Sequence, residues 1–406
     1  MSHSHARYIL YGIVAGVLLG VFAGWYFGPA MTAFGWFGTL FLDALKMLIV
    51  PLIFAAVISG VASLGDIRKL GRLGGVTVLY FVATTGIAVV IGLILVNLID
   101  PGHGVTLGSS AAATEKMASL KSASATDILH TLIQPNLVQS AVEGELLPLI
   151  VFAILLSAAL TTLGAVGEHV IMFFNGVNEA MMKLVTWLMY LAPIGIFSLI
   201  SNRLGVAGGG DAVWVELKAV GLYVATVLSG LGMHFVVLVL ILVFVARRPI
   251  TYLLGLLRAL LTAFGTASSS ATLPLTMECA REEGVNQKAV RFVLPLGATV
   301  NMNGTALYEA CAAMFIAQAY GFDLTLGQQV IVFVTATLAA IGAAGIPEAG
   351  LVTLLIVLKS VGLPSEGVAL ILAVDWFLDR FRTSVNVWGD AVGAAVVHRI
   401  LPQNQE

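Results

Sequence analysis

Charged side chains are scarce in this sequence. They make up 10% of its 406 residues, whereas soluble domains carry about a quarter. So little surface charge would not keep a soluble protein monodisperse, and a formal net charge of −2 gives no basis for binding nucleic acid. Cysteines are also few: Cys279 and Cys311 lie in apolar sequence. Two cysteines exclude a disulfide framework and favour buried packing roles.

Long apolar runs are what the sequence has instead. Apolar residues reach 59%, and the clearest runs are Tyr8–Phe27, Val76–Ile99, Leu147–Leu163 and Val220–Val245. A helix needs about 20 such residues to cross a bilayer. Because lipid offers no hydrogen-bonding solvent, these spans must be helices, and the alternating segments of a membrane barrel are absent. The sequence therefore predicts an all-α integral membrane protein.

The positive charges that flank these runs predict the orientation of the chain. They are Arg7 before the first span, Arg68, Lys69 and Arg72 after the second, and Arg247 with Arg248 after the run that ends at Val245. The positive-inside rule puts all of them in the cytoplasm, so both termini are expected there. The stretch of small and polar residues at 101–126 is expected to be an external loop.

Two segments in the last 160 or so residues interrupt apolar sequence with glycine, proline and hydroxyl residues. They are Thr262–Thr276 and Ala339–Gly350, and each is expected to be two short helices that meet at a tip inside the membrane. Each is followed by a helix that carries unusual polar residues. Interrupted segments in corresponding positions predict inverted repeats with substrate and ions at their interface.

The last of these helices carries a polar stripe. Its members, spaced three and four residues apart on one helical face, are Asp375, Asp379, Arg382, Asn386 and Asp390, with Thr383 beside them. Ionisable groups at membrane depth are costly and functional by default. A guanidinium suits a carboxylate, and a nearby aspartate suits an ammonium, so the stripe favours an amino acid with an acidic side chain. Asp390 with Asn386 offers oxygen ligands for a small cation. The alternative is an ion-pair network that only joins helices.

Other polar residues of this region are predicted to serve the same site. Ser268–Ser270 can present backbone amides at a half-helix N-terminus, where a carboxylate is favoured; the alternatives are small-residue packing and a serine hydrolase. Asn301–Thr305 is expected to break its helix at Gly304 and to expose carbonyls to a cation. Glu309, in an otherwise apolar helix, is a candidate proton carrier or else a satisfied buried acid.

Six segments then make a resemblance specific. They lie at residues 45–64, 147–160, 267–276, 294–310, 341–352 and 375–390, and include ASSSATLPLT, NMNGT and DWFLDRFRTSVNVWGD. In these segments, in this order, the chain resembles the dicarboxylate/amino acid:cation symporter family, the glutamate transporters. The resemblance covers nearly the whole chain.

The resemblance implies eight transmembrane helices, two re-entrant hairpins, a homotrimer and an elevator mechanism. A scaffold would comprise helices one and two (1–72) and helices four and five (127–204). A transport domain would comprise helix three (73–100) and residues 205–406, with hairpins at about 251–282 and 325–360. No long insertion occupies the loop at 101–126, which favours a bacterial inner-membrane protein.

The resemblance also implies roles, residue by residue. Substrate would be bound by Ser268, Ser269, Thr305, Ile346, Gly350, Asp379, Arg382, Thr383 and Asn386. One sodium site would comprise Gly297, Asn301, Asn386 and Asp390, and a second the backbone of Thr299, Met302, Ala340, Ile341 and Ala343. Having both Asp379 and Arg382 favours glutamate or aspartate over neutral amino acids and plain diacids. Arg380 and Glu309 resemble the eukaryotic pattern.

One motif departs from the family. Asn303 stands where the family has aspartate, and Phe81 where it has tyrosine, although Thr84 and Thr85 remain. A third sodium site is therefore expected to be weak, and proton coupling through Glu309 is predicted. No cofactor is expected, only transported H⁺ and/or Na⁺. The alternatives are a proton-coupled C4-dicarboxylate carrier, a fully sodium-dependent glutamate/aspartate transporter and an anion channel.

Overall fold

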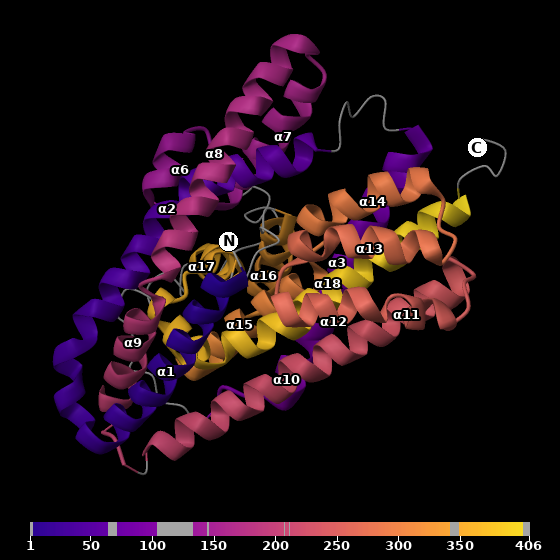
Figure 1. The fold of residues 1–406 in the computed structure, drawn as a ribbon. Coiled ribbons are helices and arrows are strands. Elements are labelled where there is room, and N and C mark those ends of the chain that lie inside the picture. The colour runs from indigo at the N-terminus through magenta and orange to yellow at the C-terminus, as the bar shows by residue number, and fades with distance from the viewer. Residues whose placement is uncertain are drawn as a thin grey trace.

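The computed structural model describes residues 3–63, 71–103, 133–143, 146–206, 208–210, 212–341 and 349–400, and within them it contains helices and no strand. Most of the expected external loop, residues 104–126, lies outside these ranges. Cys279 and Cys311 are both free and buried, which confirms the packing role expected of them. The helices fall into two groups, each packed mainly within itself (Figure 1).

The first group comes from the N-terminal half of the chain. It contains α1 (His3–Phe27), η1 (Gly28–Phe34), α2 (Gly35–Ala62), α6 (Leu137–Glu143), α7 (Leu146–Thr161), α8 (Ala165–Met189) and α9 (Ala192–Val206). Glycines bring α1 and α9 close together: a Cβ on Gly16 would lie 2.4 Å from the carbonyl oxygen of Pro193. Small residues at such crossings permit the backbone contact that drives helix association where hydrophobicity cannot.

The second group contains α3 (Gly71–Ile99), α10 (Ala212–Leu240) with its π-helical end η3 (Ile241–Val245), α11 (Thr251–Gly255), α12 (Leu257–Thr266), α13 (Ser269–Glu282), α14 (Gln287–Val300), α15 (Asn303–Ala319), α16 (Leu326–Ile341), α17 (Ala349–Ser360), η4 (Ser365–Val368) and α18 (Ala369–Ile400). All 17 residues of α15 are buried, so this helix is the centre of the group. It packs against α3, α10, α16, α17 and α18.

Three helical stretches of the described residues are long and apolar enough to cross a membrane. They are Tyr11–Ala62, which contains η1, α2 and the part of α1 from Tyr11 onward, then Leu73–Ile99 and Leu217–Val245. The α8–α9 pair passes the same criterion together and is bent by 58°. Other apolar helices are shorter, with 10 to 17 residues. Long spans and short apolar helices thus coexist in one membrane-type fold.

The interrupted segments form pairs of short helices. The first comprises α12 and α13 and the second α16 and α17, with residues 342–348 outside the described ranges. A third break separates α14 from α15, and here the expected position was wrong. The helix ends at Val300 and restarts at Asn303, so Gly304 lies inside α15. Gly304 is required for contact instead, because a Cβ there would lie 2.7 Å from the carbonyl oxygen of Arg382.

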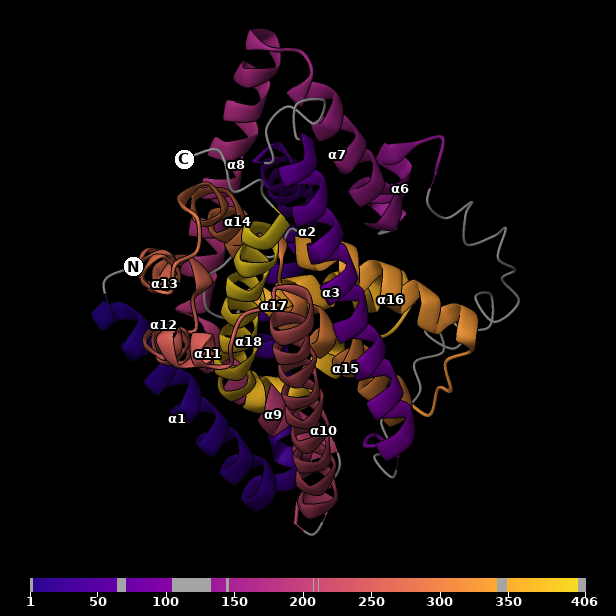
Figure 2. The same ribbon diagram turned by 90° about the vertical axis from the view of Figure 1, so that its right-hand side faces the viewer.

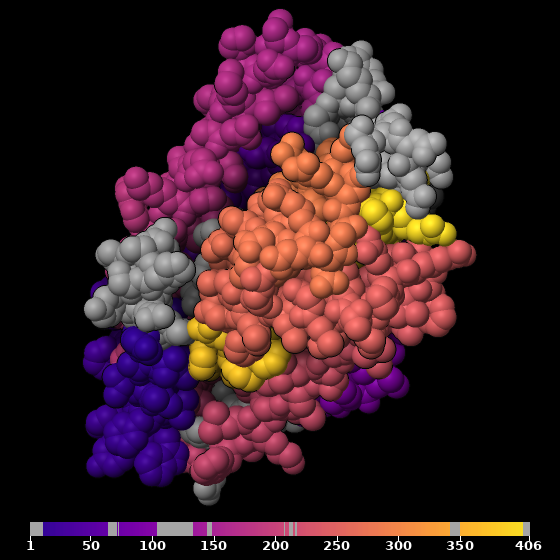
Figure 3. Space-filling model, turned by 45° about the vertical axis from the view of Figure 1, so that its right-hand side comes forward, coloured from indigo at the N-terminus to yellow at the C-terminus, as the bar shows by residue number. Residues whose placement is uncertain are grey.

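Helix α18 runs through the second group. The turned view has α12 and α13 on one side of α18 and α16 on the other (Figure 2). In the space-filling view, the yellow C-terminal part of the chain appears at two separated places, with α13 and α14 covering the region between them (Figure 3). Since α12, α13 and α14 all contact α18, these three helices cover the middle of α18, which carries the polar stripe.

One polar contact between the two groups involves a lysine of α2. Lys46 of α2 lies between Asp43 on its own helix and Glu366 of η4, with its Nζ 3.2 Å and 3.4 Å from their carboxylate oxygens. Further along α2, a Cβ on Gly60 would be 3.2 Å from the carbonyl oxygen of Ile341. The end of α16 therefore meets α2 without an intervening side chain.

Candidate functional site

The polar stripe of α18 is buried and paired within itself. The guanidinium of Arg382 donates from Nη1 to Asp375 and from Nη2 to Asp379, each over 2.8 Å. Arg382 is 0% exposed, and both aspartates are buried. A charge taken out of water is tolerated when it is paired and hydrogen-bonded, and removing one partner of such a pair costs roughly 3–5 kcal/mol. One cation and two carboxylates give this cluster an excess of negative charge.

An aromatic ring and a backbone segment enclose the same guanidinium. Arg382 lies over the ring of Tyr308 on α15, with its Cζ 3.9 Å from the centroid, a cation–π contact. On another side lies Gly350 of α17, where a Cβ would be 3.1 Å from Nη1. Asp375 and Tyr308 received no individual role from the sequence. The signal for Asp375 was its place on the stripe, while nothing in the sequence distinguished Tyr308.

The serine run lies where one short helix ends and the next begins. Ala267 adopts a left-handed conformation (φ +49°) that ends α12, and Ser268 is the N-cap of α13. The Ser268 hydroxyl accepts a hydrogen bond from the amide of Ala271 over 3.1 Å. The serine run therefore begins a helix, as the sequence predicted, and amide groups of its first turn are left for another acceptor.

Arg380 joins the end of α12, just before the serine run, to α18. It extends from α18 to the end of α12, where its Nη1 donates to the carbonyl oxygens of Phe264 and Gly265 over 3.0 Å and 2.9 Å. These carbonyls belong to the last turn of α12, which has no intrahelical donors left. These bonds attach the last turn of α12, just before Ser268, to the helix that carries the polar stripe.

One side chain joins the stripe to the start of α15. The amide oxygen of Asn386 accepts from the backbone NH of Gly304 over 2.7 Å, and its Nδ2 donates to the hydroxyl of Thr305 over 3.1 Å. The neighbouring Thr383 is buried. The expected substrate residues Thr305, Asp379, Arg382, Thr383 and Asn386 thus occupy one buried region, whereas Ile346 lies outside the described residues.

A second polar cluster lies one turn beyond Asn386 on α18. The carboxylate of Asp390 accepts from Nδ2 of Asn301 over 2.9 Å. A Cβ on Gly297 would be 2.3 Å from Oδ1 of Asp390, so the carboxylate lies directly against that backbone. The described residues contain no group of three His, Cys, Asp or Glu that could hold a metal. Carboxylate, amide and carbonyl oxygens together suit a small hard cation.

The residues expected to form a third sodium site border this cluster. Asn303 is fully buried, and among the described residues neither its amide oxygen nor its amide nitrogen has a hydrogen-bond partner. Thr84 approaches Asn301 at 3.5 Å, and Thr85 and Phe81 are buried nearby on α3. Buried amides are normally paired, so the orphaned Asn303 indicates a place where water or an ion fits.

A hydroxyl that sequence reasoning did not consider also reaches this cluster. Tyr80 of α3 donates from its Oη to the carbonyl oxygen of Gly389 over 2.9 Å. Gly389 faces Asn303 as well, since a Cβ there would lie 2.7 Å from Nδ2 of that residue. The tyrosine one position before Phe81 therefore brings α3 into contact with the polar part of α18.

The expected second sodium site falls at two helix ends. Thr299 and Met302 flank the C-terminus of α14, and Ala340 with Ile341 ends α16. These two helices contact each other. The last carbonyls of a helix have no intrahelical donors, so two adjacent C-termini supply oxygens of the kind that a cation needs. Ala343 lies outside the described residues.

Glu309 lies one turn beyond Thr305 in the fully buried α15. It is 0% exposed, and among the described residues neither carboxyl oxygen has a hydrogen-bond partner. No ion pair involving it occurs within the described ranges. An ionised carboxylate in this position would be strongly disfavoured, whereas a neutral acid is tolerated.

Buried ionic residues at the junction of paired short helices define a class, that of helical membrane transporters. The chain belongs to the sodium:dicarboxylate symporter family, whose description matches residues 9–400. It is therefore a transporter and not an enzyme, and its apolar helices are consistent with a multi-pass membrane protein. The serine-hydrolase alternative is thereby excluded. The family description names sodium as the coupled ion.

Curated relatives carry consistent names. An "Excitatory amino acid transporter" of Caenorhabditis elegans is 41% identical over 407 residues, which cover 89% of this chain and 80% of that protein. "Excitatory amino acid transporter 3" of Mus musculus is 39% identical, covering 91% and 79%. The Homo sapiens protein of the same name is 37% identical, covering 98% and 87%.

Proposed function

We propose that this chain is a secondary active symporter of glutamate and aspartate, driven by cation gradients. The observation that carries the proposal is the buried pair of Asp379 and Arg382 on one face of α18. An acidic amino acid has an ammonium for Asp379 and a distal carboxylate for the fork of Arg382. Ser268, Ser269, Thr305, Ile346, Gly350, Thr383 and Asn386 would bind the remainder.

The names of the relatives support this substrate class, since each is called an excitatory amino acid transporter. A C4-dicarboxylate would leave Asp379 facing a second anion, which opposes that alternative. Competition uptake separates the two. Aspartate and glutamate should compete with labelled aspartate, whereas succinate should not. Equal transport of succinate and aspartate would reject the proposal.

For the architecture we propose eight transmembrane helices with two re-entrant hairpins, α12–α13 and α16–α17. The group of α1, α2 and α6–α9 would be the scaffold, and the group of α3 and α10–α18 would move across the membrane as an elevator. The separate packing of the two groups supports this division. We propose further that the protein is a homotrimer in a bacterial inner membrane, with both termini in the cytoplasm.

For the coupling we propose sodium at Asp390 and Asn301 with Gly297 and Asn386, and at the helix ends of α14 and α16. The third site, with Thr84, Thr85 and Asn303, would bind sodium weakly, because a neutral amide replaces a formal negative charge. Glu309 would carry a proton, since full burial in α15 disfavours a charged carboxylate relative to the neutral acid.

Full sodium dependence is the second candidate. It is favoured by the intact Asn301–Asp390 contact and by the family's description. Uptake into proteoliposomes, with sodium, proton and potassium gradients imposed one at a time, separates the candidates. Proton coupling predicts accumulation under an inward proton gradient alone. Strict sodium dependence without any response to protons would favour the second candidate.

A further inference from the structure

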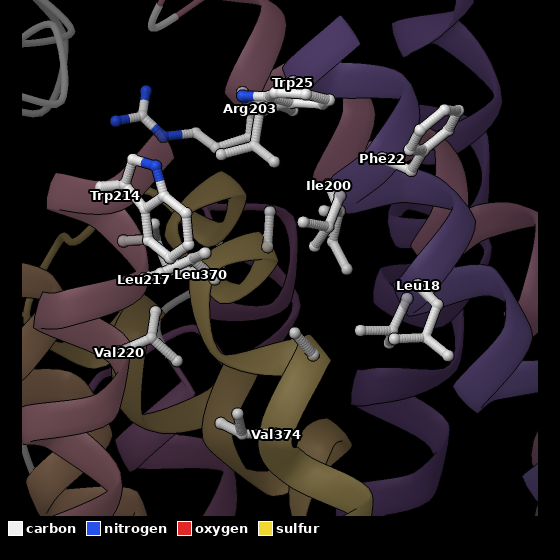
Figure 4. A pocket seen from close by; sticks show the side chains of 15 residues that line it. Leu18, Phe22, Trp25, Ile200, Arg203, Trp214, Leu217, Val220, Leu370 and Val374 are labelled. Atoms are coloured by element: carbon white, nitrogen blue, oxygen red, sulfur yellow. The ribbon is translucent and has the colours of Figure 1, made fainter. Parts of the chain in front are cut away.

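A cavity of about 580 Å³ lies where α1 and α9 of the first group meet α10 and α18 of the second (Figure 4). Its size is within the range of about 300–1,000 Å³ that is typical of sites for small molecules. It is separate from the polar stripe: the part of α18 that lines it, Ala369 to Val374, ends before Asp375. Nothing in the proposed transport function uses it.

One end of this cavity has the character of a membrane–water interface. Trp25 lies near the end of α1, Arg203 in the last turn of α9 and Trp214 near the start of α10 (Figure 4). The ends of these helices meet here, since the NH of Gly210, between α9 and α10, donates to the carbonyl oxygen of Trp25 over 3.3 Å. Tryptophan favours the headgroup level of a bilayer, and arginine at helix ends extends to it.

The rest of the cavity is apolar. Of the 15 described residues that line it, Arg203 alone is charged. Leu18 lies seven residues before Trp25 on α1, which corresponds to a depth of about 10 Å along the helix. Its floor is formed by side chains that the fold buries, namely Ile200, Leu204 and Leu370.

We propose that this cavity binds a phospholipid of the surrounding bilayer, with the phosphate at Arg203 and one acyl chain along the apolar floor. The positive charge at the interfacial end complements a phosphate, and guanidinium–phosphate contacts are strong and directional. The apolar side chains deeper in the cavity suit a hydrocarbon chain, and they offer no hydrogen-bond partner to a polar solute. Because both helix groups line the cavity, the lipid is a contact between them.

Photo-labelling of the full-length protein tests this proposal. The probe is phosphatidylglycerol with a diazirine in one acyl chain, placed in phosphatidylcholine vesicles. Lipids around the protein can label exposed residues such as Leu79 and Leu254, which are 71% and 63% exposed. Only an inserted chain can label Ile200, Leu204 or Leu370, so peptide mapping should find label on this floor. Label confined to exposed residues would overturn the proposal.

Two variants, each with a matched control, sharpen the test. Ala373→Trp fills the cavity and should remove the floor label, whereas Ala83→Trp on the exposed face of α3 should not. Arg203→Gln should weaken labelling about tenfold, the equivalent of one charge-assisted contact, while Arg247→Gln at the exposed end of η3 should leave it unchanged. Floor label that persists in Ala373→Trp, or is independent of Arg203, contradicts the assignment. So does cross-linking of the floor to a second copy of the chain.

Discussion

Arg382 and Asp375 lie seven residues apart on α18, and a 2.8 Å hydrogen bond from Nη1 to Oδ1 joins them. The second arm of the same guanidinium is bound to Asp379. Without substrate, therefore, the cation proposed to receive the distal carboxylate is already satisfied by two carboxylates of its own helix. A substrate carboxylate that binds both Nη1 and Nη2 in a bidentate fashion would replace at least one of them, so Asp375 would compete with it.

This competition predicts the effect of Asp375→Asn. A neutral amide holds the guanidinium less strongly than a carboxylate, and hydrogen bonds to charged groups are worth about 1.5–3 kcal/mol. Aspartate should therefore bind about tenfold more tightly to the variant, measured as Kd by isothermal titration calorimetry. Asp43→Asn, which removes a carboxylate from α2, is the control and should leave Kd unchanged. An unaltered Kd in Asp375→Asn would show that Asp375 does not compete.

Arg382→Ala tests the receptor of the distal carboxylate. Removing the guanidinium leaves Asp375 and Asp379 without their cation, and loss of such a buried pair costs roughly 3–5 kcal/mol. Uptake of aspartate and glutamate should disappear, while uptake of serine or alanine should be retained or appear. Neutral uptake also shows that the variant is folded. Unchanged affinity for aspartate would refute the role of Arg382.

Asp379→Asn tests the receptor of the ammonium. The variant retains the fork of Arg382 but has no formal charge for the substrate's amino group. Preference for aspartate over succinate should therefore fall by about tenfold or more, the range expected for one charge-assisted hydrogen bond. Competition of both compounds against labelled aspartate measures this ratio. A ratio equal to that of the wild type would place the ammonium elsewhere.

Glu309→Gln tests the proton carrier. Glutamine matches the shape of a neutral glutamic acid but cannot release a proton. Aspartate uptake under an inward proton gradient without sodium should be present in the wild type and absent in the variant. Exchange of internal for external aspartate, which needs no net proton movement, should continue in both. A variant that follows the proton gradient as the wild type does would exclude Glu309.

Asn303→Asp tests the third ion site by a gain of charge, not by a loss. Restoring a formal negative charge beside Asn301 and Gly389 should strengthen sodium binding and steepen the dependence of uptake on sodium concentration. Asn136→Asp is a matched control, because Asn136 only caps α6 through its side-chain oxygen, a role that aspartate retains. An identical sodium response in wild type and Asn303→Asp would remove Asn303 from the cation sites.

The sequence predicted the α18 stripe well because a helix converts spacing directly into a shared face. The same reasoning located the serine run at the start of α13, where a hydroxyl and small residues are local signals. It misplaced the break before α15 at Gly304, whereas the break lies at Asn301 and Met302. In the structure Gly304 allows close contact with α18 instead. Such a tertiary contact is not visible in the local sequence pattern. The stacking of Tyr308 on Arg382 is equally non-local.

The position of Lys46 between Asp43 and Glu366 has a consequence for any sliding of one helix group past the other. Glu366 would depart with the second group, but Asp43 is on the same helix as Lys46 and stays. The ammonium of Lys46 thus keeps Asp43 as a counter-ion throughout. The cost of an unpaired charge does not add to the free-energy barrier of the sliding movement. Lys46 can therefore pair with Glu366 in one position of the second group and lose that pair in another, and the loss does not slow the movement.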